Sequence, residues 1–123
     1  TTEEDSYEQY LVKKDVQFIE KIHQVIEENL DNSDFNIDTI ASTIGLSRSA
    51  FFKKLKSLTG FAPVDLVKEI RLNKSIELIK NSDMSISEIA FAVGFKDSGY
   101  FSKCFRKKYD QTPREYMNEW RKG

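Results

Sequence analysis

The stretch Ile37-Asp-Thr-Ile40-Ala41-Ser-Thr-Ile44-Gly45 returns later in the chain as Ile86-Ser-Glu-Ile89-Ala90-Phe-Ala-Val93-Gly94. After each glycine a further pair of stretches matches: Ser47-Arg-Ser-Ala-Phe51-Phe-Lys53-Lys-Leu55 and Asp97-Ser-Gly-Tyr-Phe101-Ser-Lys103-Cys-Phe105. A proline, a glutamate and an arginine complete the copies, as Pro63, Glu69 and Arg71 and as Pro113, Glu119 and Arg121. Matching residues lie 49 positions apart up to the glycine and 50 apart beyond it. Because an internal repeat decides the architecture, both copies should adopt one structure.

Each copy is predicted to form a short helix, a glycine turn and a second helix. In the first copy Asn36 caps the first helix, Gly45 ends it in a left-handed conformation, and Ser47 caps the second helix. The corresponding residues of the second copy are Ser85, Gly94 and Asp97. The residues expected to face inward are Ile37, Ile40, Ala41, Ile44, Phe51, Leu55 and Leu58, then Ile86, Ile89, Ala90, Val93, Phe101 and Phe105. This order is that of the helix-turn-helix motif, whose second helix enters the DNA major groove.

Three further helices are predicted outside the two motifs. One starts at Asp15, where apolar residues begin to recur at steps of three and four, and ends before Asp31. A second runs from Pro63 to about Lys80, and a third starts at Pro113 behind the cap Thr112. The apolar residues of the first are Phe18, Ile19, Ile22, Val25, Ile26 and Leu30.

The helix from Pro63 to about Lys80 carries two apolar faces. One face holds Leu66, Val67, Ile70 and Leu78, and the other holds Leu72, Ile76 and Ile79. We therefore expect it to pack against two bodies and to act as a rigid strut between them. About 18 residues at 1.5 Å each give roughly 27 Å. That length is close to the roughly 34 Å of one DNA turn that separates successive major-groove faces.

The sequence thus predicts an all-α protein of about seven helices, with two helix-turn-helix lobes joined by a long linker helix. The expected organisation is an acidic linker or arm over 1–14, a first lobe over 15–61, the linker helix over 62–82 and a second lobe over 83–123. Because the chain starts at Thr1 without a methionine, we expect it to be part of a longer protein. One cysteine, Cys104, excludes an internal disulfide and suits a reducing compartment.

The charge is distributed unevenly, although the net charge is only −1. Residues 1–36 hold ten acids against three lysines, a balance of −7. Residues 37–123 hold sixteen basic residues against ten acids, a balance of +6. Nucleic-acid binding depends on local positive charge, so the repeat region qualifies as a binding surface and the N-terminal arm does not.

Polar and cationic residues gather on the outer face of each second helix. In the first copy Ser49, Phe52, Lys53 and Lys56 share this face, and in the second Gly99, Ser102, Lys103 and Arg106 occupy it. Ser98 and Tyr100 lie near the start of the second of these helices. Hydroxyls reach base edges or phosphates, and lysine favours guanine O6 and N7. Phe52 either contacts a thymine methyl or covers the edge of the core.

A second group of residues is expected at DNA phosphates, which fix register without reading sequence. Its cations are Arg48, Lys54, Lys56, Arg106, Lys107 and Lys108. The helix N-termini at Asn36 and Ser85 add free backbone amides that can bind phosphate.

The repeat resembles the DNA-binding domain of AraC/XylS-type transcription regulators over about residues 15–121. The strongest match is Ile86-x-x-Ile89-Ala90-x-x-x-Gly94-Phe95-x-Asp97-x-x-Tyr100-Phe101-Ser102-Lys103-x-Phe105-Arg106-Lys107, continued by Thr112-Pro113-x-x-Tyr116. The resemblance implies that two helix-turn-helix lobes insert their second helices into adjacent major-groove segments. It carries the base-reading positions over to Ser49, Phe52, Lys53, Ser98, Gly99, Tyr100, Ser102 and Lys103.

The chain departs from the usual family pattern at three kinds of position. Lysine stands at 53 and 103 where arginine is common, which weakens two-point contact with guanine. Asp110 takes a place usually held by glycine, and Gly99 has no side chain for direct readout. The acidic arm and the Asp15–Leu30 helix together resemble the C-terminal output domains of hybrid two-component sensors.

Two other classes of protein explain the sequence less well than a DNA-binding regulator does. A helical protein-interaction module would explain the helices but not the matching cationic faces. An enzyme is disfavoured because His23 has no partner motif, Cys104 lies beside Phe105 as a small buried thiol, and metal-ligand or phosphate-loop spacing is missing. We expect no cofactor and no metal.

The expected partners are double-stranded DNA and RNA polymerase, in the cytoplasm of a bacterium. No membrane contact is expected from this segment, although a larger parent protein could tether it. Dimerisation is expected to come from domains upstream of Thr1. The sequence does not reveal the operator, the inducing signal, or whether transcription is activated or repressed.

Overall fold

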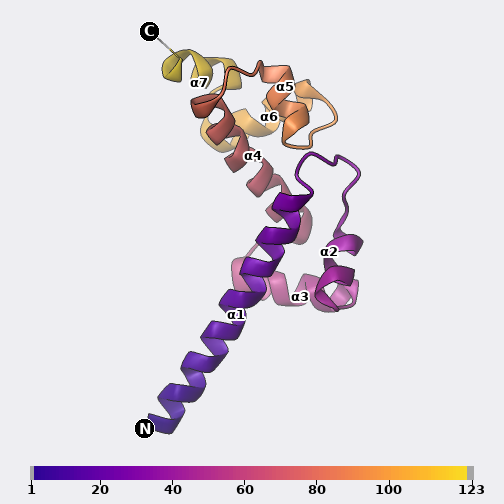
Figure 1. The fold of residues 1–123 in the computed structure, drawn as a ribbon, viewed down its shortest axis with the longest axis vertical. Helices are drawn as coiled ribbons and strands as arrows, with labels where there is room; N and C mark the ends of the chain where they lie inside the picture. Colours follow the sequence, from indigo (N-terminus) through magenta and orange to yellow (C-terminus); the bar gives the residue numbers. More distant parts are fainter. Residues whose placement is uncertain (1, 122–123) are drawn as a thin grey trace. The chain divides into compact units, whose positions relative to one another are not determined.

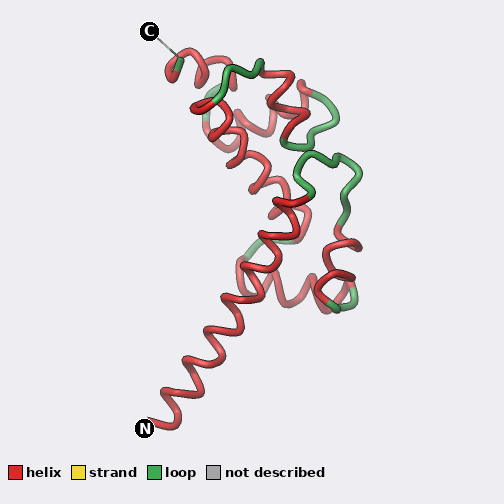
Figure 2. Tube along the Cα trace, viewed as in Figure 1, coloured by secondary structure: helices red, strands yellow, loops and turns green. Residues whose placement is uncertain are grey.

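The computed structural model describes residues 2–121. Over this range the chain consists of α-helices joined by loops and turns (Figure 2). The seven helices of the described range confirm the all-α prediction (Figure 1). Their bounds are α1 Thr2–Glu28, α2 Ile37–Ile44, α3 Arg48–Thr59, α4 Pro63–Asn81, α5 Ile86–Ala92, α6 Ser98–Tyr109 and α7 Pro113–Trp120.

The chain forms two compact units. The first contains the residues up to Glu28 together with Asn36–Leu66, and the second contains Asn29–Phe35 together with the residues from Val67 onward. Helix α4 therefore contributes its first turn to one unit and the rest of its length to the other. The assignment of Asn29–Phe35 to the second unit has no counterpart in the sequence pattern.

The first unit is built around two large apolar side chains of α3. Phe51 and Leu55 have no exposed surface, and Ile40 and Ala41 of α2 are buried beside them. Helix α1 packs on α2, and its Phe18 ring lies 6.4 Å from the ring of Phe51. The buried residues of α1 are Phe18, Ile22, Val25 and Ile26, all of them on the predicted apolar stripe. Of the other two residues predicted on this stripe, Ile19 is half-buried, and Leu30 is buried but lies beyond the end of α1 at Glu28.

The second unit has a core of aromatic rings in mutual contact. The Phe101 ring lies 5.2 Å from that of Phe95 and 5.8 Å from that of Phe105, both edge to face. Phe105 continues the chain of rings to Tyr109 at 4.6 Å and to Tyr116 at 5.8 Å. Edge-to-face packing is favoured by the ring quadrupoles, so this cluster fixes how α6 is rotated about its axis.

Buried residues lie on more than one side of α4, as its two apolar faces predicted. Leu66 and Ile70 are buried from one face, and Leu72 and Ile79 from the other. Arg71 and Ser75 are buried as well. The Ser75 hydroxyl donates to the Leu72 carbonyl oxygen at 2.6 Å. A helix covered on both sides in this way has no single apolar stripe.

Two expectations about local structure are wrong. Helix α1 begins at Thr2 and not at Asp15. Its sequence holds no proline or glycine, Glu3, Glu4 and Asp5 lie where the helix dipole favours acids, and elongation from an existing helix is easier than nucleation. Leu58 is 38% exposed and does not face inward, because it lies in the last turn of α3, beyond the turns that carry Phe51 and Leu55.

All the predicted N-caps are confirmed. Each side chain accepts a hydrogen bond from the backbone N–H three residues further on, so each satisfies a donor that the helix leaves free. The five capping residues are Asn36, Ser47, Ser85, Asp97 and Thr112.

Gly60 and Asp110 occupy matching positions after α3 and α6, and both adopt a left-handed conformation. Their φ angles are +79° and +60°, and Asp110 is the one non-glycine residue with positive φ in the described range. Glycine adopts this region without steric penalty, whereas a side chain with a Cβ does not. The second copy therefore carries backbone strain that the first copy avoids.

We expect Asp110→Gly to raise the free energy of unfolding by about 0.5–1 kcal/mol, because it removes this strain. The reverse change at the matching position, Gly60→Asp, should lower stability by about 1 kcal/mol. Urea unfolding of the two variants measures both effects. Equal losses in both variants would contradict this account of Asp110.

Candidate nucleic-acid interface

Helix α3 presents a polar and cationic face on the side away from its core stripe. Phe51 and Leu55 are fully buried, whereas Ser49, Lys53 and Lys56 are exposed. Phe52 is 47% exposed, so part of this residue is open to solvent. The residues that share this outer face are therefore available to a ligand, and they follow directly on the Ser47 cap.

Helix α6 repeats this arrangement in the second unit. Its Phe101 and Phe105 side chains are fully buried. On the opposite side Gly99, Lys103 and Arg106 are exposed and Ser102 is half-buried. The two helices thus present corresponding outer faces, each within its own unit.

The Tyr100 side chain at the start of α6 contacts two other residues of its unit. The Tyr100 ring lies 6.0 Å from the Phe95 ring, and the Lys68 ammonium lies 5.8 Å from the Tyr100 ring centre. Tyr100 nevertheless keeps 52% of its surface exposed, and Ser98 is half-buried. Tyr100 can therefore present its hydroxyl outward while its ring contacts hold the side chain in place.

Asn36 and Ser85 use their side chains to cap their own helices. The Asn36 side-chain oxygen accepts from the Thr39 N–H at 3.1 Å. The Ser85 hydroxyl accepts from the Glu88 N–H at 3.1 Å, and the Glu88 carboxylate accepts from the Ser85 N–H at 3.1 Å. Hydrogen bonds from the Ser85 backbone and then its side chain hold the pKa of Glu88 below its usual value. A carboxylate thus already occupies the start of α5, which disfavours phosphate there.

Two of the predicted phosphate cations have partners within the chain. The Lys108 ammonium forms an ion pair with Glu69 and donates to the Asn73 side chain at 2.6 Å. The Lys54 ammonium lies 4.3 Å from the centre of the Phe18 ring. Lys108 is half-buried and joins α6 to α4, so it acts as a brace in this structure.

The other predicted cations are exposed, as Lys54 also is. Lys56, Arg106 and Lys107 are open to solvent. Arg48 lies 3.6 Å from the Asp38 carboxylate, and both side chains are largely exposed, so water screens this pair strongly. These four cations remain accessible to a polyanion.

Two buried or half-buried arginines carry structural roles that the sequence did not predict. Arg71 donates from its guanidinium to the carbonyl oxygens of Gly94 and, at 3.2 Å, Asn32. Arg121 donates to the carbonyl oxygens of Ile79 at 3.0 Å and Met84 at 2.7 Å. One feature of the sequence could have indicated these roles, since Arg71 and Arg121 occupy matching positions in the repeat. A residue present in both copies is expected to have a structural role in each.

Tyr109 lies beside the Lys108 brace, and its phenol donates to the Asn73 side chain at 3.1 Å. Burial, followed by the nearby charge of Glu69 and by Tyr116, raises the pKa of Tyr109 to about 12. The phenol therefore stays protonated and able to donate over the physiological pH range.

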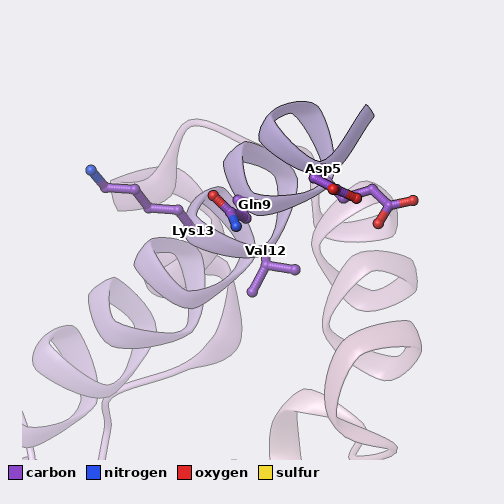
Figure 3. Close-up of a pocket in the computed structure, with 5 residues that line it drawn as sticks. Asp5, Gln9, Val12 and Lys13 are labelled. Carbon is purple, nitrogen blue, oxygen red and sulfur yellow. The ribbon is translucent and has the colours of Figure 1, made fainter. Parts of the chain in front are cut away.

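His23 and Cys104 are the two residues that a catalytic site could have used. His23 and Cys104 are half-buried on α1 and α6, in different units. Within residues 2–121 no group of three or more His, Cys, Asp or Glu side chains is arranged to hold a metal ion. A hollow on α1 is lined by Asp5, Glu8, Gln9, Val12 and Lys13, and its labelled side chains project from the surface of this one helix (Figure 3). In the same described range, no helix combines the length and apolarity needed to cross a membrane.

Comparison with known proteins identifies the family. A family model described as a helix-turn-helix domain matches residues 40–119, which include most of α2, all of α3–α6 and most of α7. A solved AraC-type DNA-binding-domain regulator from Chromobacterium violaceum is 27% identical, with a TM-score of 0.79 over 86% of this chain and 94% of its own. The chain belongs to the AraC-type helix-turn-helix family of transcription regulators.

Two further relatives bear on function. The DNA-binding domain of the global transcriptional factor AdpA, solved with a target DNA, is 28% identical, with a TM-score of 0.77 over 85% of this chain and 92% of its own. Histidine kinase P4 of Formosa agariphila is 38% identical over 106 residues. The match covers 86% of this chain but only 8% of that kinase, so the chain corresponds to a small part of this relative.

We expect Ser85→Ala to lower the free energy of unfolding by about 1 kcal/mol at neutral pH, because it removes an N-cap. The pKa of Glu88 should rise toward its usual value, since one of its hydrogen-bond donors is lost. NMR titration of Glu88 and urea unfolding measure the two effects.

The stability gap between wild type and Ser85→Ala should narrow in acid. A carboxyl group with a depressed folded pKa stabilises above its unfolded pKa, about 4.3 for glutamate, and this contribution is lost as the pH falls through the folded pKa. Ser87→Ala, an exposed change on the same helix, serves as the control. A gap that stays constant from neutral pH to pH 3 would refute the coupling.

Proposed function

We propose that the chain binds double-stranded DNA in a sequence-specific manner and regulates transcription, with α3 and α6 as its recognition helices. The observation that carries the proposal is the recurrence of one outer face on both helices. In each, small polar residues and a lysine follow directly on a capped N-terminus, opposite a fully buried stripe. The likeness to the AdpA domain, which was solved with a target DNA, supports the same reading.

Base reading is assigned to the exposed or half-exposed residues of these two faces. Lysine at 53 and 103 suits guanine O6 and N7, and the serine hydroxyls suit either donors or acceptors on base edges. The exposed Phe52 ring suits a thymine methyl group. The proposed base-reading residues are Ser49, Phe52, Lys53, Ser98, Gly99, Tyr100, Ser102 and Lys103. At Gly99 only the backbone can take part.

Phosphate contact is assigned to four exposed cations and to one helix N-terminus. The proposed residues are Arg48, Lys56, Arg106 and Lys107, with the amides at Asn36. Lys54 and Lys108 are left out because their ammonium groups contact Phe18 and Glu69. Ser85 is left out because Glu88 already occupies the start of its helix.

The wider setting of the chain is also a proposal. The chain is 38% identical to a small part of histidine kinase P4, which favours a role as the DNA-binding output segment of a larger two-component sensor. RNA polymerase would be the second partner, the setting would be the bacterial cytoplasm, and dimerisation would come from other parts of that protein. No catalysis is assigned to this segment.

Selection of bound sequences from a random duplex pool tests the proposed function. Binding of the enriched duplex should weaken steeply between about 50 and 200 mM salt, since released counterions drive association. A scrambled duplex of the same composition should bind far more weakly. A helical module that binds only other proteins would enrich no sequence and would ignore duplex DNA at low salt.

We expect Lys53→Ala and Lys103→Ala each to cost about 1–3 kcal/mol on the selected site and to relax base preference at one position. Binding constants for the selected site and for single-base variants measure both effects. An equal loss on scrambled DNA would instead assign both lysines to phosphates.

Lys107→Ala should weaken binding to all sequences and reduce the slope of log K against log salt by about one. Lys108→Met is the matched control, because its ammonium is held by Glu69 and Asn73. It should lower the thermal midpoint of unfolding but leave the salt slope unchanged. The assignment fails if the two variants change the slope equally.

A further inference from the structure

Arg71 connects three segments of the second unit. It lies on α4 and is only 8% exposed. Its Nη1 donates to the carbonyl oxygen of Gly94, in the turn between α5 and α6. Its Nη2 donates at 3.2 Å to the carbonyl oxygen of Asn32, in the loop that follows α1. One guanidinium therefore ties both the turn and the loop to α4.

The Gly94 turn fits closely against this guanidinium. Gly94 has a φ of +95°, and a Cβ added to it would overlap the Leu30 carbonyl oxygen and the guanidinium of Arg71. The turn is closed by a hydrogen bond from the Phe95 N–H to the Ala90 carbonyl oxygen at 2.9 Å. Because the α6 cap, Asp97, follows only three residues after Gly94, the seating of this turn sets where α6 begins.

The chemistry of the site indicates positioning rather than simple stabilisation. Burial lowers the pKa of Arg71, and its buried Nε has no hydrogen-bond partner. A buried charge with incompletely satisfied donors is a poor way to gain stability, and an apolar side chain of similar size would avoid the desolvation. What the guanidinium provides is two donors in a rigid plane, directed at two separate backbone segments.

The matching arginine of the second copy lacks the contact to a recognition turn. Arg121 donates to the Ile79 and Met84 carbonyl oxygens, at the end of α4 and in the loop that enters α5. Arg71 has an equivalent contact, through Asn32, to the loop that enters α2. The bond to Gly94 is thus the feature that distinguishes Arg71 from its repeat partner. A second tie between the same loop and turn is the ion pair of Lys96 with Asp34 at 3.0 Å.

We propose that Arg71 is a positioning residue for DNA recognition, which sets the orientation of the start of α6 by holding the Gly94 turn against α4 and the Asn29–Phe35 loop. This role rests on the proposed function. Arg71 itself is buried and is not assigned a DNA contact. Its loss should therefore affect readout by α6 selectively and leave readout by α3 in place.

The test uses the selected duplex and two derivatives, in which either half of the site is scrambled. The half read by α6 is identified as the one whose scrambling weakens binding less in Lys103→Ala than in the wild-type chain. For each protein, the ratio of dissociation constants for scrambled and intact halves gives the discrimination by each helix. Arg71→Met should lower discrimination at the α6 half about tenfold, the size of one lost charged hydrogen bond, and leave the α3 half within about twofold. Arg121→Met is the matched control and should preserve both ratios.

The outcomes separate the two proposals. If the wild-type chain shows no discrimination at either half, the proposed function fails. If the wild type discriminates and Arg71→Met keeps its ratio at the α6 half, or loses both ratios equally, the positioning role is overturned. A merely structural role would reduce the folded fraction, which lowers binding to all three duplexes by one factor.

A variant that does not fold leaves the inference testable. Arg71→Lys retains the charge but cannot donate to both carbonyls in one plane, so it should give an intermediate loss at the α6 half. Hydrogen exchange of the wild-type chain needs no variant. Amides of residues 29–33 should exchange more slowly on the intact duplex than on the duplex with the α6 half scrambled. Equal protection on both duplexes would contradict the proposed link.

Discussion

The burial of one apolar stripe on each recognition helix is the constraint on which the rest of the structure depends. Phe51 and Leu55 fix the rotation of α3 in the first unit, and Phe101 and Phe105 fix that of α6 in the second. Burial of one stripe fixes the rotation of a helix about its axis, and the opposite face is then the one exposed to solvent. These four side chains therefore determine which residues of α3 and α6 can contact a partner. The lysines and serines of the two outer faces owe their accessibility to this burial. The interface is thus a consequence of packing within each unit.

Most of the helices, their caps and their buried stripes could be predicted from the sequence. The patterns that encode them are local and occur in both copies of the repeat. Caps such as Asn36 and Asp97 depend on a side chain reaching an amide three residues away, and the apolar stripes depend on helical spacing alone. The start of α1 was missed because acidic, exposed residues have no apolar period even when they continue a helix. Leu58 was misplaced because spacing along a helix does not reveal where the core ends.

Contacts between segments distant in the sequence could not be predicted from a single sequence. The bonds from Arg71 to Gly94 and Asn32 span 23 and 39 residues, and no local pattern encodes them. No local pattern encodes the ion pair of Lys108 with Glu69 either, and the sequence therefore predicted Lys108 as a phosphate ligand. Lys103 and Lys108 are similar in sequence, but tertiary packing leaves one exposed and the other half-buried. The fold and the outer faces of α3 and α6 could therefore be predicted from the sequence. It could not be predicted which cations form contacts within the chain and which remain free to bind DNA.

The most direct test of the central claim is NMR mapping of the chain on its selected duplex, with amide and side-chain shifts assigned free and bound. Two separate clusters of large changes are predicted, one around Ser49 and Lys53 on α3 and one around Ser98 and Lys103 on α6. Buried residues such as Phe51 should change little. Large changes confined to other helices, with both outer faces unaffected, would contradict the account.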